Sequence, residues 1–220
     1  KAKNKFISKI ATSGLDTVAI RVPSNKVALE VINHFNLPFA APSANRYGKI
    51  SPTSATDVFE ELNGKVTTIL NGGNTKVGIE STVIDISNKK TKILRHGAIS
   101  EESINKLIKI HKKEITTILR SPGLSNSHYK PDKPIRINAV RPREGEGWLA
   151  FGKKPSYFDG VSFTLSEKKC LDESAKNLYK MLRLLDKKNV RSIAIQKIPK
   201  KGIGLAINDR LRRAAFIKDK

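Results

Sequence analysis

Apolar and polar side chains alternate near the start of the chain, and this alternation predicts a strand. Val18, Ile20 and Val22 would share one face of an extended segment, while Thr17 and Arg21 would share the other. We therefore expect a strand over residues 17–23 with one polar face.

Elsewhere the spacing of apolar residues predicts both helices and strands. Helical spacing and capping residues occur at 27–35, 55–62, 100–108, 172–185 and 207–215. Short apolar runs beside turn residues predict strands at 39–41, 66–70, 83–86, 93–94, 135–137, 147–151, 161–165 and 192–195. Beyond residue 134 the order of these elements indicates a small α/β domain with parallel-sheet character.

A segment at 121–131 is rich in Pro, Gly, Ser and Asn and has neither periodicity, so it is the best candidate for an interdomain linker. We divide the chain into a first domain at 1–115, a linker at 116–134 and a small α/β domain at 135–220. The first ten residues resemble the end of an earlier element, and we expect that further sequence precedes Lys1.

Composition narrows the class of protein. The 220 residues are 38% hydrophobic, which is enough for a core, and no apolar run approaches the roughly 20 residues of a membrane helix. We therefore expect a cytoplasmic protein with no membrane partner. The single cysteine, Cys170, excludes an internal disulfide, and the four histidines lack zinc-ligand spacing. No protein-held metal is predicted.

The chain is strongly basic, with 42 Lys and Arg against 20 Asp and Glu and a formal charge of +22. The electrostatic field of so basic a surface attracts polyanions, and RNA is the natural partner to consider. Scattered solvated lysines explain the charge as well, because no RNP, zinc-finger or helix-turn-helix signature accompanies it. We expect no DNA partner.

Candidate chemistry is concentrated in three clusters of small hydroxyl and amide residues: PSAN at 42–45, SPT at 51–53 and GIEST at 78–82. Each lies beside a predicted strand, where loops on a rigid sheet present hydroxyls, amides and backbone N–H groups to a ligand. One such cluster alone is better explained as a turn. Three together, with basic residues nearby, favour a binding site.

The strings TVAIRVP, PFAAPSAN, SPT, GIESTVID and LRHG, in this order, resemble the threonylcarbamoyl-AMP synthase family, the YrdC-like proteins. SPGLSNSHYKP resembles the linker of this family, and KNLYKMLRLLDKKNVRSIAI with GIGLAINDRLRRAA resembles the C-terminal domain of its two-domain form. The resemblance implies an α/β fold: a YrdC-like twisted open sheet domain, of which the chain holds the C-terminal part, followed by a small Rossmann-like domain.

The resemblance also implies an activity. Such an enzyme condenses L-threonine, bicarbonate or CO2, and ATP into threonylcarbamoyl-adenylate and pyrophosphate, for the N6-threonylcarbamoyladenosine modification of tRNA. It is a nucleotidyltransferase, with ATP as a substrate and Mg2+ carried by the ATP phosphates. Partners would include tRNA or tRNA-modification proteins. A carbamate must attack the α-phosphorus, so positioning and electrostatic stabilisation are the chemical demands.

Matching residue by residue, the resemblance implies that Ser43 and Asn45 belong to the catalytic group and also contact ATP. Ser51 matches a nucleotide contact, and Arg95 matches an ATP-contacting arginine. Tyr129, with His128, would fold over the nucleotide as a lid and exclude water.

On the threonine side, Arg21 matches the arginine that holds the carboxylate, by two parallel hydrogen bonds. Ser81 matches a second hydroxyl, and Thr17 and Ala41 would line the same pocket.

Alternatives stay open for several residues. Arg21 could lie on the surface at a strand edge, Arg95 could cap a sheet edge, and His128 could be structural. Glu80 is a tempting base, but we expect it to orient its loop. Asn208, Asp209 and Arg210 form a polar trio that a helix cap with salt bridges explains as well as a site does.

One departure from the family pattern lies at the N-terminus, where its Lys-x-Arg pair and preceding Pro-Gly-Pro have no counterpart. Because these cations would face the α-phosphate, we expect this chain alone to bind ATP weakly and to turn over poorly. An alternative function is a noncatalytic RNA-binding or translation-associated YrdC-like protein. Carbamoyl transfer in hydrogenase maturation ranks last, because that related domain lacks the C-terminal domain found here.

Overall fold

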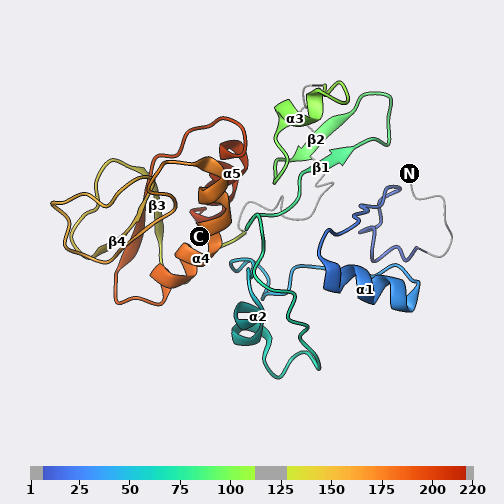
Figure 1. The fold of residues 1–220 in the computed structure, drawn as a ribbon, viewed down its shortest axis with the longest axis horizontal. Helices are drawn as coiled ribbons and strands as arrows, with labels where there is room; N and C mark the ends of the chain where they lie inside the picture. The colour runs from blue at the N-terminus through green and yellow to red at the C-terminus, as the bar shows by residue number, and fades with distance from the viewer. Residues whose placement is uncertain (1–6, 112–127, 217–220) are drawn as a thin grey trace.

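The structure, a computed structural model, describes residues 7–111 and 128–216. We call these the N-terminal part and the C-terminal module. Figure 1 shows them on opposite sides of the molecule, with α1 at one end and the parallel sheet at the other. The predicted linker residues 116–127 lie outside the described residues.

The C-terminal module is built on a parallel four-stranded sheet with strand order β3-β6-β4-β5. Its elements are β3 (Ile135–Ala139), β4 (Glu146–Ala150), β5 (Ser162–Thr164), α4 (Leu171–Asp186), β6 (Ser192–Gln196) and α5 (Gly204–Ala214). The predicted parallel-sheet character is therefore confirmed, and so is the α/β fold class.

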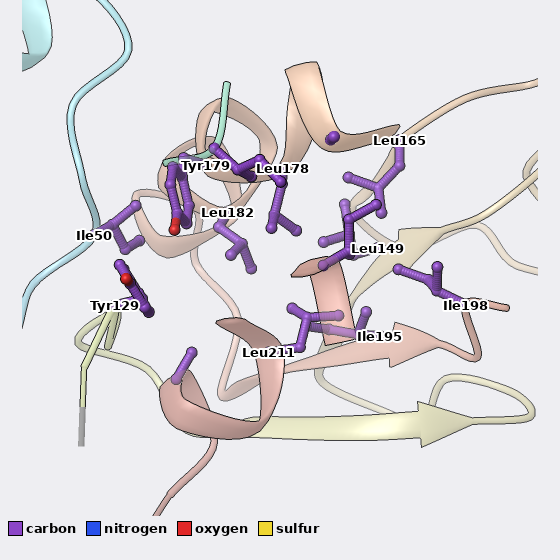
Figure 2. Close-up of a cluster of buried hydrophobic side chains, with 14 of the residues drawn as sticks. Ile50, Tyr129, Leu149, Leu165, Leu178, Tyr179, Leu182, Ile195, Ile198 and Leu211 are labelled. Carbon is purple, nitrogen blue, oxygen red and sulfur yellow. The ribbon is translucent and has the colours of Figure 1, made fainter. Parts of the chain in front are cut away.

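Both faces of the central strand β4 are covered, as is usual for parallel sheets. Leu149 packs in a large cluster with apolar side chains of α4 and α5, including Leu178, Leu182 and Leu211 (Figure 2). On the other face Trp148 packs in a smaller cluster with small residues of neighbouring strands. This module contains most of the buried apolar side chains of the described chain.

The N-terminal part contains α1 (Lys26–Phe35), α2 (Ala55–Leu62), β1 (Val83–Asp85), β2 (Lys92–Arg95) and α3 (Glu101–Asn105). Helix α1 begins at Asn25, whose side chain accepts from the Ala28 amide, and α2 begins at Ser54, which forms a capping box with Asp57. Strands β1 and β2 pair antiparallel. The predictions of both helices and of this strand pair are confirmed.

Three predicted strands, at 17–23, 39–41 and 66–70, are wrong for the structure as described. A strand needs a hydrogen-bonded neighbour, and within residues 7–111 and 128–216 these segments have none. The apolar face predicted for 17–23 is open, with Ile20 84% and Val22 82% exposed. Alternation identifies the two faces of an extended segment, but it does not supply the partner strand.

Helix α5 begins earlier than predicted, at Gly204, and α3 ends earlier, at Asn105. The N-cap position of α5 is Ile203, which provides no side-chain cap, so no local signal marked its start. The 208–210 trio therefore lies inside the helix and is not a cap, but the salt bridges expected for it are confirmed at Asp209 and Arg210. Among the residues that the structure describes, no helix is long and apolar enough to span a membrane.

Candidate active site and its junction with the C-terminal module

The centre of the predicted site region is the carboxylate of Glu80, in the GIEST cluster. Ser51 donates its hydroxyl to Oε1 at 2.8 Å, and the Tyr179 hydroxyl lies 3.0 Å from both carboxylate oxygens. Arg210 donates from Nε to Oε2 at 3.0 Å. We call Ser51, Glu80, Tyr179 and Arg210 the Glu80 junction. It joins two loops of the N-terminal part to α4 and α5.

The electrostatics of the junction keep Glu80 ionised. Burial by itself would raise the pKa of Glu80, but attraction to Arg210 and the Ser51 hydrogen bond outweigh it, so the pKa is lowered. The Tyr179 pKa is raised well above its usual value by burial and by the Glu80 charge, so Tyr179 stays a proton donor. A carboxylate with three donors and a lowered pKa is a poor general base. The arrangement agrees with the expectation that Glu80 orients its loop.

The backbone of the next residue, Ser81, is hydrogen-bonded by Arg95 of strand β2. Its carbonyl oxygen accepts from Arg95 Nε at 3.2 Å and from Nη2 at 3.0 Å. Gly97 lies directly against this loop, since a Cβ there would be 2.3 Å from the Ser81 carbonyl carbon. The structure therefore brings together the predicted threonine-side residue Ser81 and the predicted ATP-side residue Arg95.

A second contact joins the loop after PSAN to the start of the C-terminal module. The Lys130 amide donates to the Gly48 carbonyl at 2.7 Å, and the Tyr47 ring lies 6.3 Å from that of His128. Asn45 donates its amide to the carbonyls of Arg46 at 2.8 Å and Lys49 at 3.2 Å. Its Oδ1 is buried and has no hydrogen-bond partner among the described residues. The Asn45 amide is thus fixed in orientation with one acceptor unused.

Tyr129, predicted as a lid residue, is 1% exposed and lies beside Ile50 and Tyr179 (Figure 2). Its ring stacks on Tyr179 with a centroid distance of 5.6 Å, and the Arg210 guanidinium lies 5.8 Å from its centroid. Its backbone is left-handed, with φ 63°. The neighbouring His128 is half-buried, and burial lowers its pKa. A role for this pair over a nucleotide stays a prediction.

The remaining predicted residues have few contacts with the rest of the described chain. Arg21, Ala41 and Ser43 are exposed, Thr17 is half-buried, and no side-chain hydrogen bond joins any of them to another described residue. The described contacts therefore unite Ser51, Ser81, Arg95 and Tyr129 around the Glu80 junction, while Asn45 bonds only within its own loop. They do not extend to the predicted threonine carboxylate contact, Arg21.

Sequence reasoning missed two residues of the junction. Arg210 belongs to the trio that was noticed, but its partner Glu80 is 130 positions away. Tyr179 was not singled out in the predicted helix at 172–185. The available signal was its place beside the apolar stripe, since the hydroxyl of a buried tyrosine usually finds a partner.

This fold and junction define a two-part α/β protein. Its parallel-sheet module contacts polar loops of the N-terminal part, and these loops carry hydroxyl and amide groups that can bind a ligand. Comparison with known families gives two matches. The family model described as "Telomere recombination", for the Sua5, YciO and YrdC proteins, matches residues 1–97. The model described as "Threonylcarbamoyl-AMP synthase, C-terminal domain" matches residues 99–216.

Curated relatives agree with these matches. The threonylcarbamoyl-AMP synthase of Pyrococcus abyssi is 38% identical, over 97% of this chain and 68% of that protein. That of Bacillus subtilis is 36% identical, over 97% of this chain and 67% of that protein. The chain belongs to the threonylcarbamoyl-AMP synthase family, as the sequence motifs predicted.

Solved structures are similar over the same extent. The crystal structure of P. abyssi Sua5 complexed with L-threonine superposes with a TM-score of 0.83 at 36% identity, covering 96% of this chain and 68% of that one. A variant of the same protein, with a consecutive histidine and tyrosine replaced by alanine, gives a TM-score of 0.80 at 34% identity, covering 96% and 67%.

Proposed function

We propose that this chain is a threonylcarbamoyl-AMP synthase, which forms threonylcarbamoyl-adenylate and pyrophosphate from L-threonine, bicarbonate or CO2, and ATP. The observation that carries the proposal is the 38% identity to a synthase over 97% of the chain. The reaction is a nucleotidyl transfer. The threonine amine adds to CO2 and loses a proton, and a carbamate oxygen then attacks the α-phosphorus as pyrophosphate leaves.

On the threonine side, we assign the carboxylate to Arg21, whose planar guanidinium suits two parallel hydrogen bonds. Ser81 would contact threonine from the loop that Arg95 and Glu80 hold, with Thr17 and Ala41 lining the pocket. A relative crystallised with L-threonine supports the amino acid as a substrate class.

On the nucleotide side, we assign the phosphates to Ser43 and Arg95, and a nucleotide contact to Asn45. The Asn45 amide nitrogen already donates to two backbone carbonyls, so its open oxygen, Oδ1, would accept from an N–H group of the nucleotide. Ser51 would contact the nucleotide through its lone pairs or backbone, since its hydroxyl hydrogen is donated to Glu80. Mg2+ would enter with ATP, because this set offers hydroxyl, amide and guanidinium groups but no carboxylate.

We further propose that His128 and Tyr129 cover the nucleotide, with Tyr129 already in its packed position against Tyr179. The structure of a relative is known with a consecutive His-Tyr pair replaced, and residues 128–129 are the His-Tyr pair of this sequence. We place the protein in the cytoplasm, with tRNA or tRNA-modification proteins as partners. The charge of +22 favours a partner that is a polyanion, such as tRNA.

A thermal-shift titration with the 220-residue chain tests this function. Saturation at about 100 times the Kd should raise the stability by about 2.7 kcal/mol, and ATP with L-threonine should give such a shift while D-threonine should not. Arg21→Met should abolish the threonine-dependent part. Arg141→Met, at another exposed arginine, should leave it unchanged.

Pyrophosphate release that requires both ATP and L-threonine should accompany the shift, at a low rate. Stabilisation by tRNA alone, with a steep salt dependence and no response to threonine, would instead support the noncatalytic RNA-binding alternative.

A further inference from the structure

A buried arginine of the C-terminal module reaches into the candidate site. Arg210 on α5 is 1% exposed, yet it donates to Glu80 Oε2 at 3.0 Å and, through Nη1, to the His96 carbonyl. Glu80 and His96 flank the residues Ser81 and Arg95 in sequence. One side chain of the module therefore holds two segments of the site.

A second group of the module, the Tyr179 hydroxyl on α4, lies 3.0 Å from each Glu80 oxygen. Its ring is fixed on the opposite side by stacking on Tyr129. Together with Ser51, these contacts give the Glu80 carboxylate donors from three separate segments. Its position is thus determined mainly by α4 and α5, because hydrogen bonds to a charged group are among the strongest in a protein.

Glu80 transmits this position to Ser81 through the backbone. The Glu80 carbonyl accepts from the Ala98 amide at 3.2 Å, and the Ser81 carbonyl accepts from Arg95. Thr82 continues the pattern by donating its hydroxyl to the Ile99 carbonyl at 2.6 Å. The loop 78–82 is therefore a short rigid segment that cannot move at Glu80 without moving at Ser81.

We propose that Tyr179 and Arg210 are positioning residues for threonine: by fixing Glu80, the C-terminal module sets the place of the Ser81 hydroxyl. This inference rests on the proposed function. It assigns to α4 and α5 a part in substrate binding, although neither helix supplies a group that contacts threonine.

Tyr179→Phe in the full chain is the primary test, because it removes one hydroxyl and keeps the ring. We expect the Kd for L-threonine, measured by NMR titration, to rise at least about fivefold, as expected when a hydrogen bond to a buried charge is lost. The Kd for ATP should rise by a smaller factor, because Ser51 keeps its hydrogen bond to Glu80 and the ring that stacks on Tyr129 is retained. Arg210→Lys keeps the positive charge but loses the planar guanidinium, which donates to two acceptors at once. It should also raise the Kd for L-threonine.

Two controls separate positioning from simple destabilisation. Tyr157→Phe makes the same chemical change at a ring that is 69% exposed, and should alter nothing. Ile193→Val removes a methylene from a fully buried strand residue, so it should lower the melting temperature without changing the Kd for threonine.

A readout that needs no ligand completes the test. Hydrogen exchange at the Ala98 amide, which bonds the Glu80 carbonyl, should accelerate in Tyr179→Phe and not in Ile193→Val. Threonine binding within twofold of the unaltered chain in both Tyr179→Phe and Arg210→Lys would overturn the positioning role alone. Failure of the unaltered chain to bind threonine at all would overturn the proposed function.

Discussion

Replacement of Gly78 by alanine should separate the N-terminal part from helix α4. Gly78 has φ +79°, and a Cβ at this position would lie 2.4 Å from the Lys176 carbonyl oxygen and 2.6 Å from the Ala175 carbonyl oxygen. Both atoms belong to the backbone of α4. Unlike the end of a long side chain, a helix backbone in a packed module cannot move aside at small cost.

The magnitude follows from two contributions. A left-handed backbone costs an alanine about 1–2 kcal/mol, and insertion of a methyl group into a packed contact adds about 1–3 kcal/mol. The sum, about 2–5 kcal/mol, corresponds to a fall in melting temperature of roughly 4–20 °C for a chain of this size. Gly64→Ala is the matched control, because Gly64 has φ +75° and no atom within 4 Å of the added Cβ.

Thermal unfolding followed by two signals gives the measurement. The single tryptophan, Trp148, lies in the core of the C-terminal module and reports on that module alone, while circular dichroism reports on all helices. Gly78→Ala should lose helical signal well before the Trp148 signal changes. Equal destabilisation by Gly78→Ala and Gly64→Ala would refute the close approach to α4, and with it the argument for a tightly held 78–82 loop.

Three further outcomes are expected. Ser54→Ala should cost about 1 kcal/mol through loss of the α2 capping box, while Thr56→Ala, inside the same helix, should cost less in the same denaturant titration. Glu61→Gln should cost about 1–3 kcal/mol because Glu61 is largely buried against Arg183, whereas Glu60→Gln, at an exposed pair with Lys187, should change stability by less than about 0.5 kcal/mol. The pKa values of Glu61 and Glu80 are lowered in the folded chain, so their stabilisation is present above the usual value of 4.5 and is lost as the pH falls below it. Unfolding measured from pH 7 to pH 3 should show this loss, and Glu61→Gln should make it less steep.

Helices were predictable wherever a local signal was complete. In α2 the amphipathic spacing, the Ser54 cap and the closing Asn63 all lie within one short segment, and the structure contains the helix as predicted. The parallel sheet was predictable for a similar reason, because strands and helices succeed one another along the chain. Both kinds of information are local in sequence.

The errors concern features that depend on distant residues. The polar trio at 208–210 looked like a helix cap, yet Asn208 donates to the Ile198 and Gly204 carbonyls and Arg210 crosses to Glu80. The segment 17–23 has the alternation of a strand but no partner strand in the described chain. Sequence indicates which groups are available, but it does not indicate which distant group each one meets.

The distribution of buried side chains gives the C-terminal module its importance for the site. Helices α1 and α2 contain no fully buried residue, whereas α4 and α5 each contain several. Apart from His128 and Tyr129, the predicted binding residues therefore lie on the part of the chain with little core of its own, and their order depends on contacts such as Gly48 with Lys130 and Glu80 with Arg210. Because loops without a core open locally at low free energy, ligand affinity should respond to changes in α4 and α5 that leave every substrate-contacting group intact.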